Sequence, residues 1–186
     1  MGQLVNDLLD ISRIESGKLK LELAQVEPAD IVDEAVQAFE QEISAKGQRL
    51  HTEVAPDLPT VSVDRGRLVQ VLTNLISNAN KYTPEGGNIT VRAEKAGEAG
   101  TPCVRWSVTD DGIGMTEEEV AQLFTKYFRS KRAAVRSVQG TGLGLVISRS
   151  IIEMHGGRLD VASAYGQGST FSVTIPSTPP TAVPGT

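Results

Sequence analysis

Four polar side chains are spaced along residues 64–82 so that they would project from one side of a helix. Asn74 and Asn78 lie four residues apart. Lys81 lies seven residues beyond the first asparagine and Tyr82 four beyond the second, and these intervals bring side chains to one face. An amide oxygen can ligate a Mg²⁺ ion that enters with a nucleotide, and a lysine can reach phosphate oxygens. A solvated helix face fits the same pattern, but asparagine is a weak helix former, which favours a binding role.

A second candidate site begins at Asp110, where an apolar strand expected over 103–109 ends. An Asp-Gly turn would explain the segment equally well. In a pocket, however, the Asp110 carboxylate would accept a hydrogen bond from the amino group of adenine, whereas the carbonyl of guanine would oppose it. The site would then select ATP over GTP, and Gly112 and Gly114 would let the backbone approach the base and sugar.

A third candidate site is a run of alternating glycines, Gly140-Thr141-Gly142-Leu143-Gly144, which opens an apolar helix expected over 141–155. Free amides at such a helix start attract phosphate. Alternating glycines also occur in tight loops and in dinucleotide-binding turns, but the latter require a preceding strand. Here a basic, irregular segment precedes them, with Arg129, Lys131, Arg132 and Arg136. These cations would contact either nucleic acid or a triphosphate, and beside an anion-binding helix start the triphosphate is favoured.

The composition limits the alternatives. The chain has 186 residues, of which 39% are apolar, which suits one domain with short extensions. A net charge of -5 argues against a protein that coats nucleic acid. Cys103 is the only cysteine, so neither a disulfide framework nor a cysteine-based metal site can form within the chain. No apolar stretch approaches the roughly 20 residues that span a bilayer.

Helices and strands alternate along the chain. The patterns predict helices over 3–16, from Pro28 past Phe39, over 64–82 and over 141–155, and strands over 19–23, 50–54, 61–63, 88–95, 103–109, 158–163 and 169–175. Thr116 and Glu119 form a capping box, which predicts that a short helix begins at Thr116, within the irregular segment before the glycine run. We therefore expect a two-layer α/β sandwich, with one mixed, mostly antiparallel sheet and helices on one face.

In this order, the motifs resemble the histidine kinase branch of the ATPase superfamily that also contains gyrase-type topoisomerases and the MutL repair proteins. Residues 74–84 resemble its asparagine box, 110–114 its first glycine box, Phe124 and Phe128 its phenylalanine box, 140–144 its second glycine box and 166–171 its last. The resemblance covers about residues 24–176.

The resemblance implies a Bergerat-type ATP-binding fold with a lid over 111–140. It implies that Asn78 ligates Mg²⁺, that Lys81 contacts phosphate, that Tyr82 packs near the adenine and that Asp110 recognises the amino group. It extends the nucleotide-binding set to Gly112, Gly114, Phe128, Arg129, Gly140, Thr141, Gly142, Leu143, Gly144 and Thr170. We expect the lid to be mobile without nucleotide and to order around the phosphates.

The resemblance also divides the chain. Residues 1–18 resemble the end of the second helix of the family's dimerisation bundle, residues 19–176 form the catalytic domain, and residues 177–186 are expected to be a disordered tail. The family's phosphoacceptor histidine lies on the first bundle helix. Neither His51, in an expected strand, nor His155, before a Gly-Gly turn, can replace it. We therefore do not expect this fragment alone to phosphorylate itself.

The function implied is phosphoryl transfer from ATP to a bundle histidine in two-component signalling. The implied partners are that bundle helix, a response regulator downstream and a second copy in a full-length homodimer, with no nucleic acid. The domain would be cytoplasmic, and membrane attachment of the parent protein is left open.

Three other functions remain as alternatives. A gyrase-type hydrolase would place a general-base carboxylate at the position of Asn74, and asparagine cannot take that proton. We therefore place Asn74 and Lys81 in the catalytic site of a kinase that hydrolyses ATP slowly. A nucleotide sensor without transfer activity and a serine kinase of the same superfamily are the other two alternatives.

Overall fold

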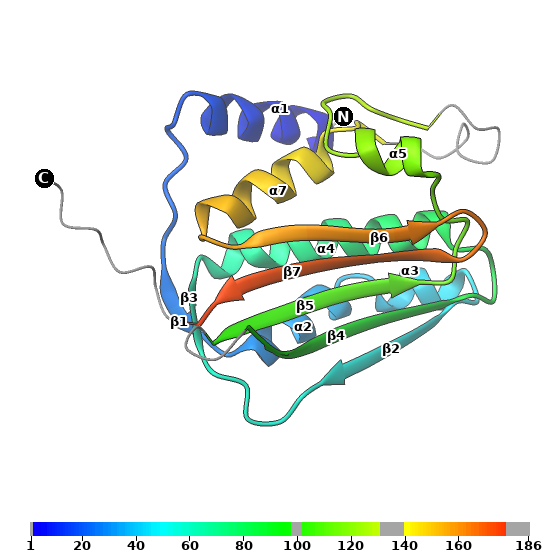
Figure 1. The fold of residues 1–186 in the computed structure, drawn as a ribbon, viewed down its shortest axis with the longest axis horizontal. Coiled ribbons are helices and arrows are strands. Elements are labelled where there is room, and N and C mark those ends of the chain that lie inside the picture. The colour runs from blue at the N-terminus through cyan, green and yellow to red at the C-terminus, as the bar shows by residue number, and fades with distance from the viewer. Residues whose placement is uncertain (1, 98–101, 131–139, 178–186) are drawn as a thin grey trace, which may run out of the picture.

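Five strands form one sheet in the order β2–β4–β5–β7–β6 in the computed structural model, which describes residues 2–97, 102–130 and 140–177 (Figure 1). They are β2 (Arg49–Val54), β4 (Asn88–Ala96), β5 (Cys103–Asp110), β7 (Gly168–Pro176) and β6 (Arg158–Ala164). β2 runs parallel to β4, and all other pairs are antiparallel. The expected mixed, mostly antiparallel sheet is confirmed.

Helices cover one face of this sheet (Figure 1). They are α2 (Pro28–Gln37), α3 (Glu40–Ala45), α4 (Arg65–Tyr82) and α7 (Gly144–Met154), while α1 (Gly2–Glu15) lies on α7. Helix α5 (Glu117–Gln122) lies within residues 111–140, the segment expected to form the lid. The core lies between helices and sheet, and Trp106 on β5 is fully buried there. Its indole Nε1 donates to the Pro28 carbonyl at 3.3 Å, which ties the sheet to the start of α2.

Helix α4 carries the asparagine face, and its bounds follow from its ends. Asp64 caps it by accepting a hydrogen bond from the amide of Arg67 at 3.0 Å. The helix ends at Tyr82 because Thr83 precedes a proline and takes an extended conformation. One stripe is buried on the sheet, namely Leu68, Val71, Leu72, Leu75, Ile76 and Ala79. The expected helix over 64–82 and the expected capping box at Thr116 and Glu119 are confirmed.

Two expectations about the N-terminal third are wrong. Residues 19–23 do not form a strand; instead β1 (Ala24–Val26) pairs with β3 (Val61–Val63) in a separate two-stranded sheet. β3 is only three residues long and its register matches β1, so residues 19–23 have no neighbouring strand to bond. The helix that begins at Pro28 also ends at Gln37, and α3 follows as a separate helix.

The expected helix over 141–155 begins three residues later, at Gly144. Gly142 has a φ of +70°, which a right-handed helix excludes. The Thr141 hydroxyl accepts from the amide of Leu143 at 3.2 Å and closes this turn. The glycine run is therefore a loop that leads into α7 rather than its first turn.

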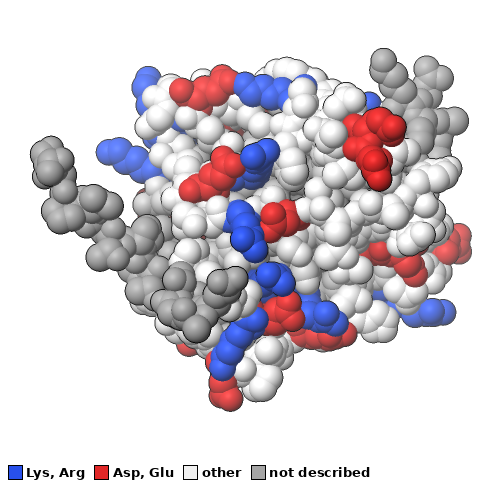
Figure 2. Space-filling view, in the orientation of Figure 1, with Lys and Arg blue, Asp and Glu red and all other residues white. Residues whose placement is uncertain are grey.

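The face of the sheet away from the helices carries both signs of charge (Figure 2). Arg92 pairs with Glu53 at 2.6 Å, and Arg105 pairs with Glu94 at 3.7 Å. No single-sign patch forms over these pairs, and exposed pairs of this kind add little stability. Within the described ranges, no helix has the length and apolar character that crossing a membrane requires.

Helix α1 buries one side against the domain and exposes the other. Asp7, Asp10 and Ile11 are buried. Four apolar side chains on the other side are about half exposed, namely Leu4, Val5, Leu8 and Leu9. Helix α1 is therefore docked on the domain and still presents apolar side chains to solvent.

Candidate functional site

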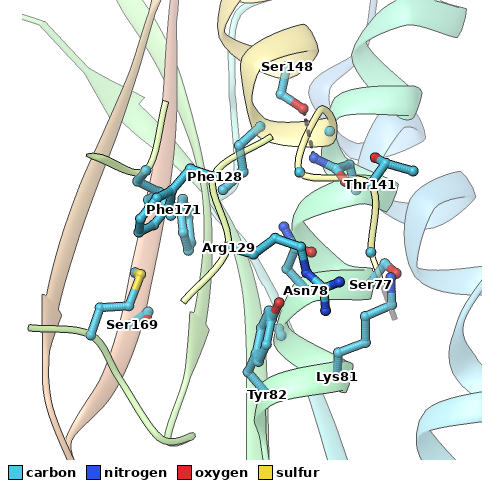
Figure 3. A pocket seen from close by; sticks show the side chains of 18 of the residues that line it. Ser77, Asn78, Lys81, Tyr82, Phe128, Arg129, Thr141, Ser148, Ser169 and Phe171 are labelled. Atoms are coloured by element: carbon cyan, nitrogen blue, oxygen red, sulfur yellow. Dashed lines mark hydrogen bonds between the residues drawn. The ribbon is translucent and has the colours of Figure 1, made fainter. Parts of the chain in front are cut away.

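A cavity of about 460 Å³ lies between α4, the start of α7, the lid and the start of β7. Figure 3 shows side chains from these elements pointing into it. The cavity is lined by most of the residues that the sequence predicts, namely Asn74, Asn78, Lys81, Tyr82, Asp110, Gly114, Phe128, Arg129, Gly140, Thr141, Gly142 and Gly144. Segments far apart in sequence thus meet at one site.

The polar face of α4 forms one wall. Asn78, Lys81 and Tyr82 point into the cavity from successive turns (Figure 3). Burial raises the pKa of the Tyr82 phenol, and the positive charge of Arg129 acts against that rise. Arg129 comes from the lid, so cations from α4 and from the lid flank the same cavity. Such an arrangement suits an anionic ligand.

Asp110 stands at the other end of the site, where β5 ends. Its side chain is buried, and its Oδ1 accepts from the amide of Gly112 at 2.9 Å. Burial raises the pKa of this carboxyl to about 6; the neighbouring charge of Asp111 also raises it, and the amides of Gly112 and Ser169 act in the opposite direction. A buried carboxylate with spare acceptor capacity at a cavity wall can bind an amino group of a ligand.

Asp111 has a different role from its neighbour. It accepts from the amide of Asn88 at 2.7 Å and from its side chain at 2.6 Å. Its slight burial acts to raise its pKa, but the hydrogen bonds from Asn88 outweigh this, and the pKa of Asp111 is lowered. Asp111 therefore fixes the turn after β5 against the start of β4, and it does not line the cavity.

Gly112 and Gly114 are both required by close contacts within the protein, and Gly114 also lines the cavity. A Cβ at Gly112 would lie 2.5 Å from the Tyr82 carbonyl oxygen, and one at Gly114 would lie 1.9 Å from the Ala164 carbonyl oxygen. The Ile113 amide also donates to the Tyr82 carbonyl at 3.2 Å. These contacts hold the Asp110 turn against the end of α4 and the end of β6.

The glycine run forms the opposite end of the cavity. A Cβ at Gly144 would lie 2.5 Å from Oδ1 of Asn74, so this glycine leaves room for that amide. Nδ2 of Asn74 donates to Oγ of Ser148 on α7 at 3.0 Å (Figure 3). The loop and the first turn of α7 thereby face the polar side of α4.

Three predicted residues do not line the cavity: Gly112, Leu143 and Thr170. Leu143 is fully buried in the core. The Thr170 hydroxyl bonds that of Thr109 at 3.0 Å, while its neighbours Ser169 and Phe171 line the cavity. Side chains alternate along a strand, so neighbours of Thr170 face the other way. The predicted cations Lys131, Arg132 and Arg136 lie outside the described residues.

Several polar residues line the cavity without having been predicted, among them Asp7, Ser148 and Ser169. Strand alternation would have selected Ser169 over Thr170. Ser148 lies one turn beyond Gly144 on the same side of α7, a spacing that could also have been used. Asp7 comes from α1, and no local pattern indicates that it reaches this cavity.

The donor set fits a magnesium ion that arrives with a nucleotide. No cluster of three or more His, Cys, Asp and Glu side chains that could hold a metal occurs in the part of the chain that the structure describes. Mg²⁺ bound to phosphates keeps several waters and needs few protein oxygens. The amide oxygen of Asn78 lines the cavity and suits that role.

A family model described as "Histidine kinase-, DNA gyrase B-, and HSP90-like ATPase" matches residues 63–179. The chain belongs to this family. The catalytic domain of the histidine kinase ThkA has the same fold, with a TM-score of 0.72 at 33% identity over 85% of this chain and 99% of that one. The chain is therefore the ATP-binding catalytic domain of a sensor histidine kinase.

Larger histidine kinases contain a similar region. Full-length ShkA, in complex with AMPPNP, matches 94% of this chain and 35% of its own chain, with a TM-score of 0.80 at 32% identity. The Non-motile and phage-resistance protein of Caulobacter vibrioides is 39% identical over 93% of this chain. The match spans 20% of the length of that relative.

Both histidines of the kinase domain lie outside the cavity. His155 is buried, with Nδ1 2.8 Å from the Ile151 carbonyl oxygen and Nε2 accepting from the Asp64 amide at 2.9 Å. The Nδ1 contact stays within the end of α7, and the Nε2 contact ties α7 to the cap of α4. His51 is exposed on β2, an edge strand.

Proposed function

We propose that this domain binds Mg-ATP in the cavity and donates its γ-phosphoryl group to a histidine on a bundle helix, in two-component signalling. The single observation that carries the proposal is the cavity itself. A buried carboxylate at Asp110 marks one end, and Asn74, Asn78 and Lys81 line it from a single helix. Membership of the family supports this use of the cavity.

The ends of the cavity have distinct tasks in this proposal. Asp110 accepts from the amino group of adenine, and Tyr82 packs near the base. Lys81, Arg129 and the amides of the glycine run bind the phosphates, and Asn78 provides one oxygen to Mg²⁺. Magnesium, when bound, neutralises charge on the phosphates. Asn74 is held beside the phosphate end by Ser148.

The transfer step needs no general base from this domain. A nitrogen of the acceptor imidazole attacks the γ-phosphorus with its lone pair as the bond to the β,γ-bridging oxygen breaks, and ADP leaves. An asparagine at position 74 cannot activate water in the way a carboxylate would, so hydrolysis stays slow. Lys81 and Arg129 stabilise the charge on the transferring group.

The domain division and the partners belong to the same proposal. Residues 1–18 correspond to the end of the second bundle helix, and residues 19–176 to the catalytic ATP-binding domain. ThkA has been crystallised with the response regulator protein TrrA. By analogy, we propose a response regulator downstream of this domain and a homodimer of the full-length protein.

Transfer of labelled phosphate from γ-labelled ATP to a purified bundle domain with its histidine tests the proposal. Asn78→Ala should reduce the transfer rate by at least about tenfold, since it removes the amide oxygen assigned to magnesium. Asn6→Ala is the matched control, because Asn6 is exposed on α1, and it should leave the rate unchanged. Equal rates for Asn78→Ala and the wild type would contradict the proposal.

A further inference from the structure

Helix α1 reaches the nucleotide cavity through one acidic side chain. Asp7 is buried and lines the cavity at the end that holds the glycine run. Its Oδ2 accepts a hydrogen bond from the Thr141 hydroxyl at 2.8 Å. Thr141 lies between two glycines of that run and also bonds the amide of Leu143 at the entry to α7. A carboxylate therefore bonds the loop that is proposed to bind phosphate.

The position of Asp7 is fixed by further contacts of α1. Asp10 is buried and receives Nη1 of Arg67 at 3.0 Å to both carboxylate oxygens, and Nε2 of Gln70 at 2.8 Å. Near the end of α1, Glu15 pairs with Lys126 of the lid. In Figure 1, α1 lies along α7 with its N-terminal end towards the lid. The helix thus touches α4, α7 and the lid together.

Phosphate binding and the contact with Asp7 compete for the same loop. The glycine run and the start of α7 attract the anionic phosphates, whereas docked α1 brings the Asp7 carboxylate to Thr141. Like charges at a partly buried site repel each other, and solvent screens them less than on an open surface. Phosphate binding and α1 docking cannot both be optimal at this end of the cavity.

We propose that Asp7 is a specificity-determining residue of the nucleotide site. Its carboxylate weakens the binding of a nucleotide, and the effect is larger for nucleotides with more phosphate charge. This inference rests on the proposed function. The coupling between α1 docking and triphosphate binding is reciprocal, because each event must weaken the other by the same factor. Triphosphate binding loosens α1 from the domain, and docked α1 lowers the affinity for triphosphate.

Calorimetric titration of the full 186-residue chain with Mg-ATP, Mg-ADP and adenosine tests the inference. Asp7→Asn keeps an oxygen that can accept from Thr141 but removes the charge. It should strengthen Mg-ATP binding by at least about threefold, Mg-ADP binding less, and adenosine binding not at all. Asp33→Asn removes a charge from an exposed position on α2 and should leave all three affinities unchanged.

Hydrogen exchange of the α1 amides provides a second readout that does not depend on activity. In the wild type, Mg-ATP should speed exchange in α1, whereas adenosine should not. In Asp7→Asn the difference between the two ligands should shrink.

Two failures can be told apart. If adenosine binds but Asp7→Asn leaves Mg-ATP affinity unchanged or weakens it, or if Mg-ATP slows exchange in α1, the inference is wrong and the proposed function stands. If the wild type binds neither adenosine nor Mg-ATP, the proposed function fails and the inference fails with it.

Discussion

Asn74 and Ser148 join the two helices that flank the glycine-run end of the cavity, through a hydrogen bond of 3.0 Å from the amide nitrogen to the hydroxyl. Ser148 is buried, so this bond is shielded from water. Gly144 leaves the space in which the Asn74 amide lies. The position of the asparagine therefore depends on a residue of α7 that lacks a side chain.

Gly144→Ala should disturb this site more than the fold. The new Cβ would lie 2.5 Å from Oδ1 of Asn74. Because that oxygen ends a flexible side chain, Asn74 can turn away, and we expect the melting temperature to change little. Phosphoryl transfer should fall by about tenfold as Asn74 leaves its place. The rate of transfer to a bundle domain, with a thermal melt alongside, measures both effects.

Gly66→Ala is the matched control for that substitution. Gly66 lies in the first turn of α4, and an added Cβ would meet only Oδ1 of Asp64, at 3.7 Å. Alanine favours a helix over glycine by up to about 1 kcal/mol, so this variant should be slightly more stable and fully active. Unchanged transfer in Gly144→Ala would show that the placement of Asn74 is not needed.

Stability should fall as pH rises through the range in which Asp110 ionises. The pKa of Asp110 is about 6 in the folded domain, against an ordinary value of 3.8. Between these values the folded chain holds a proton that the unfolded chain has lost. The contribution to the free energy of unfolding therefore drops between about pH 4 and pH 6, by an amount on the order of 3 kcal/mol.

Asp110→Asn should remove this contribution, because asparagine does not titrate. Urea unfolding of both proteins at several pH values between 4 and 7 gives the difference in free energy of unfolding. The variant should gain stability relative to the wild type as pH rises, while Asp33→Asn should follow the wild type. A difference that is flat with pH would contradict the raised pKa of Asp110.

Arg67→Ala should release α1, because it removes a cation from the buried carboxylate of Asp10. The two side chains are 22% and 11% exposed, so the loss should be about 2 kcal/mol, below the cost for a fully buried pair. Arg65→Ala is the control, since its pair with Glu34 is 52% and 49% exposed. It should cost less than about 1 kcal/mol.

Hydrogen exchange distinguishes release of α1 from general unfolding. In Arg67→Ala, the amides of α1 should exchange faster, while those of β5 and β7 stay protected. Uniformly faster exchange throughout the domain would instead mean that α1 supports the whole fold. Unchanged protection of α1 would mean that the pair between Arg67 and Asp10 does not hold the helix.

Local patterns predicted much of the fold and of the candidate site. The α4 boundaries follow from Asp64 at one end and Pro84 beyond the other, and the asparagine face follows from helical spacing. The short lid helix follows from a capping box, in which both hydrogen bonds lie within four residues. Helix boundaries, helical spacing and capping boxes depend on residues that are close in sequence, so they can be predicted from the sequence alone.

Features that depend on distant neighbours could not be predicted. The alternation of residues 19–23 is typical of a strand, but whether a strand forms depends on a partner, and β3 pairs with Ala24–Val26 instead. The participation of Asp7 depends on how α1 docks over α7. Gly112 and Gly114 have close neighbours in the protein itself, and only the packed structure identifies those atoms.

Titration of the purified chain with Mg-ATP and Mg-GTP by calorimetry, repeated with Asp110→Asn, tests the central claim most directly. The account predicts binding of Mg-ATP, at least about tenfold weaker binding of Mg-GTP, and loss of Mg-ATP binding in the variant. Equal affinities for the two nucleotides, or full Mg-ATP affinity in Asp110→Asn, would contradict the assignment of Asp110 as the adenine-recognising residue.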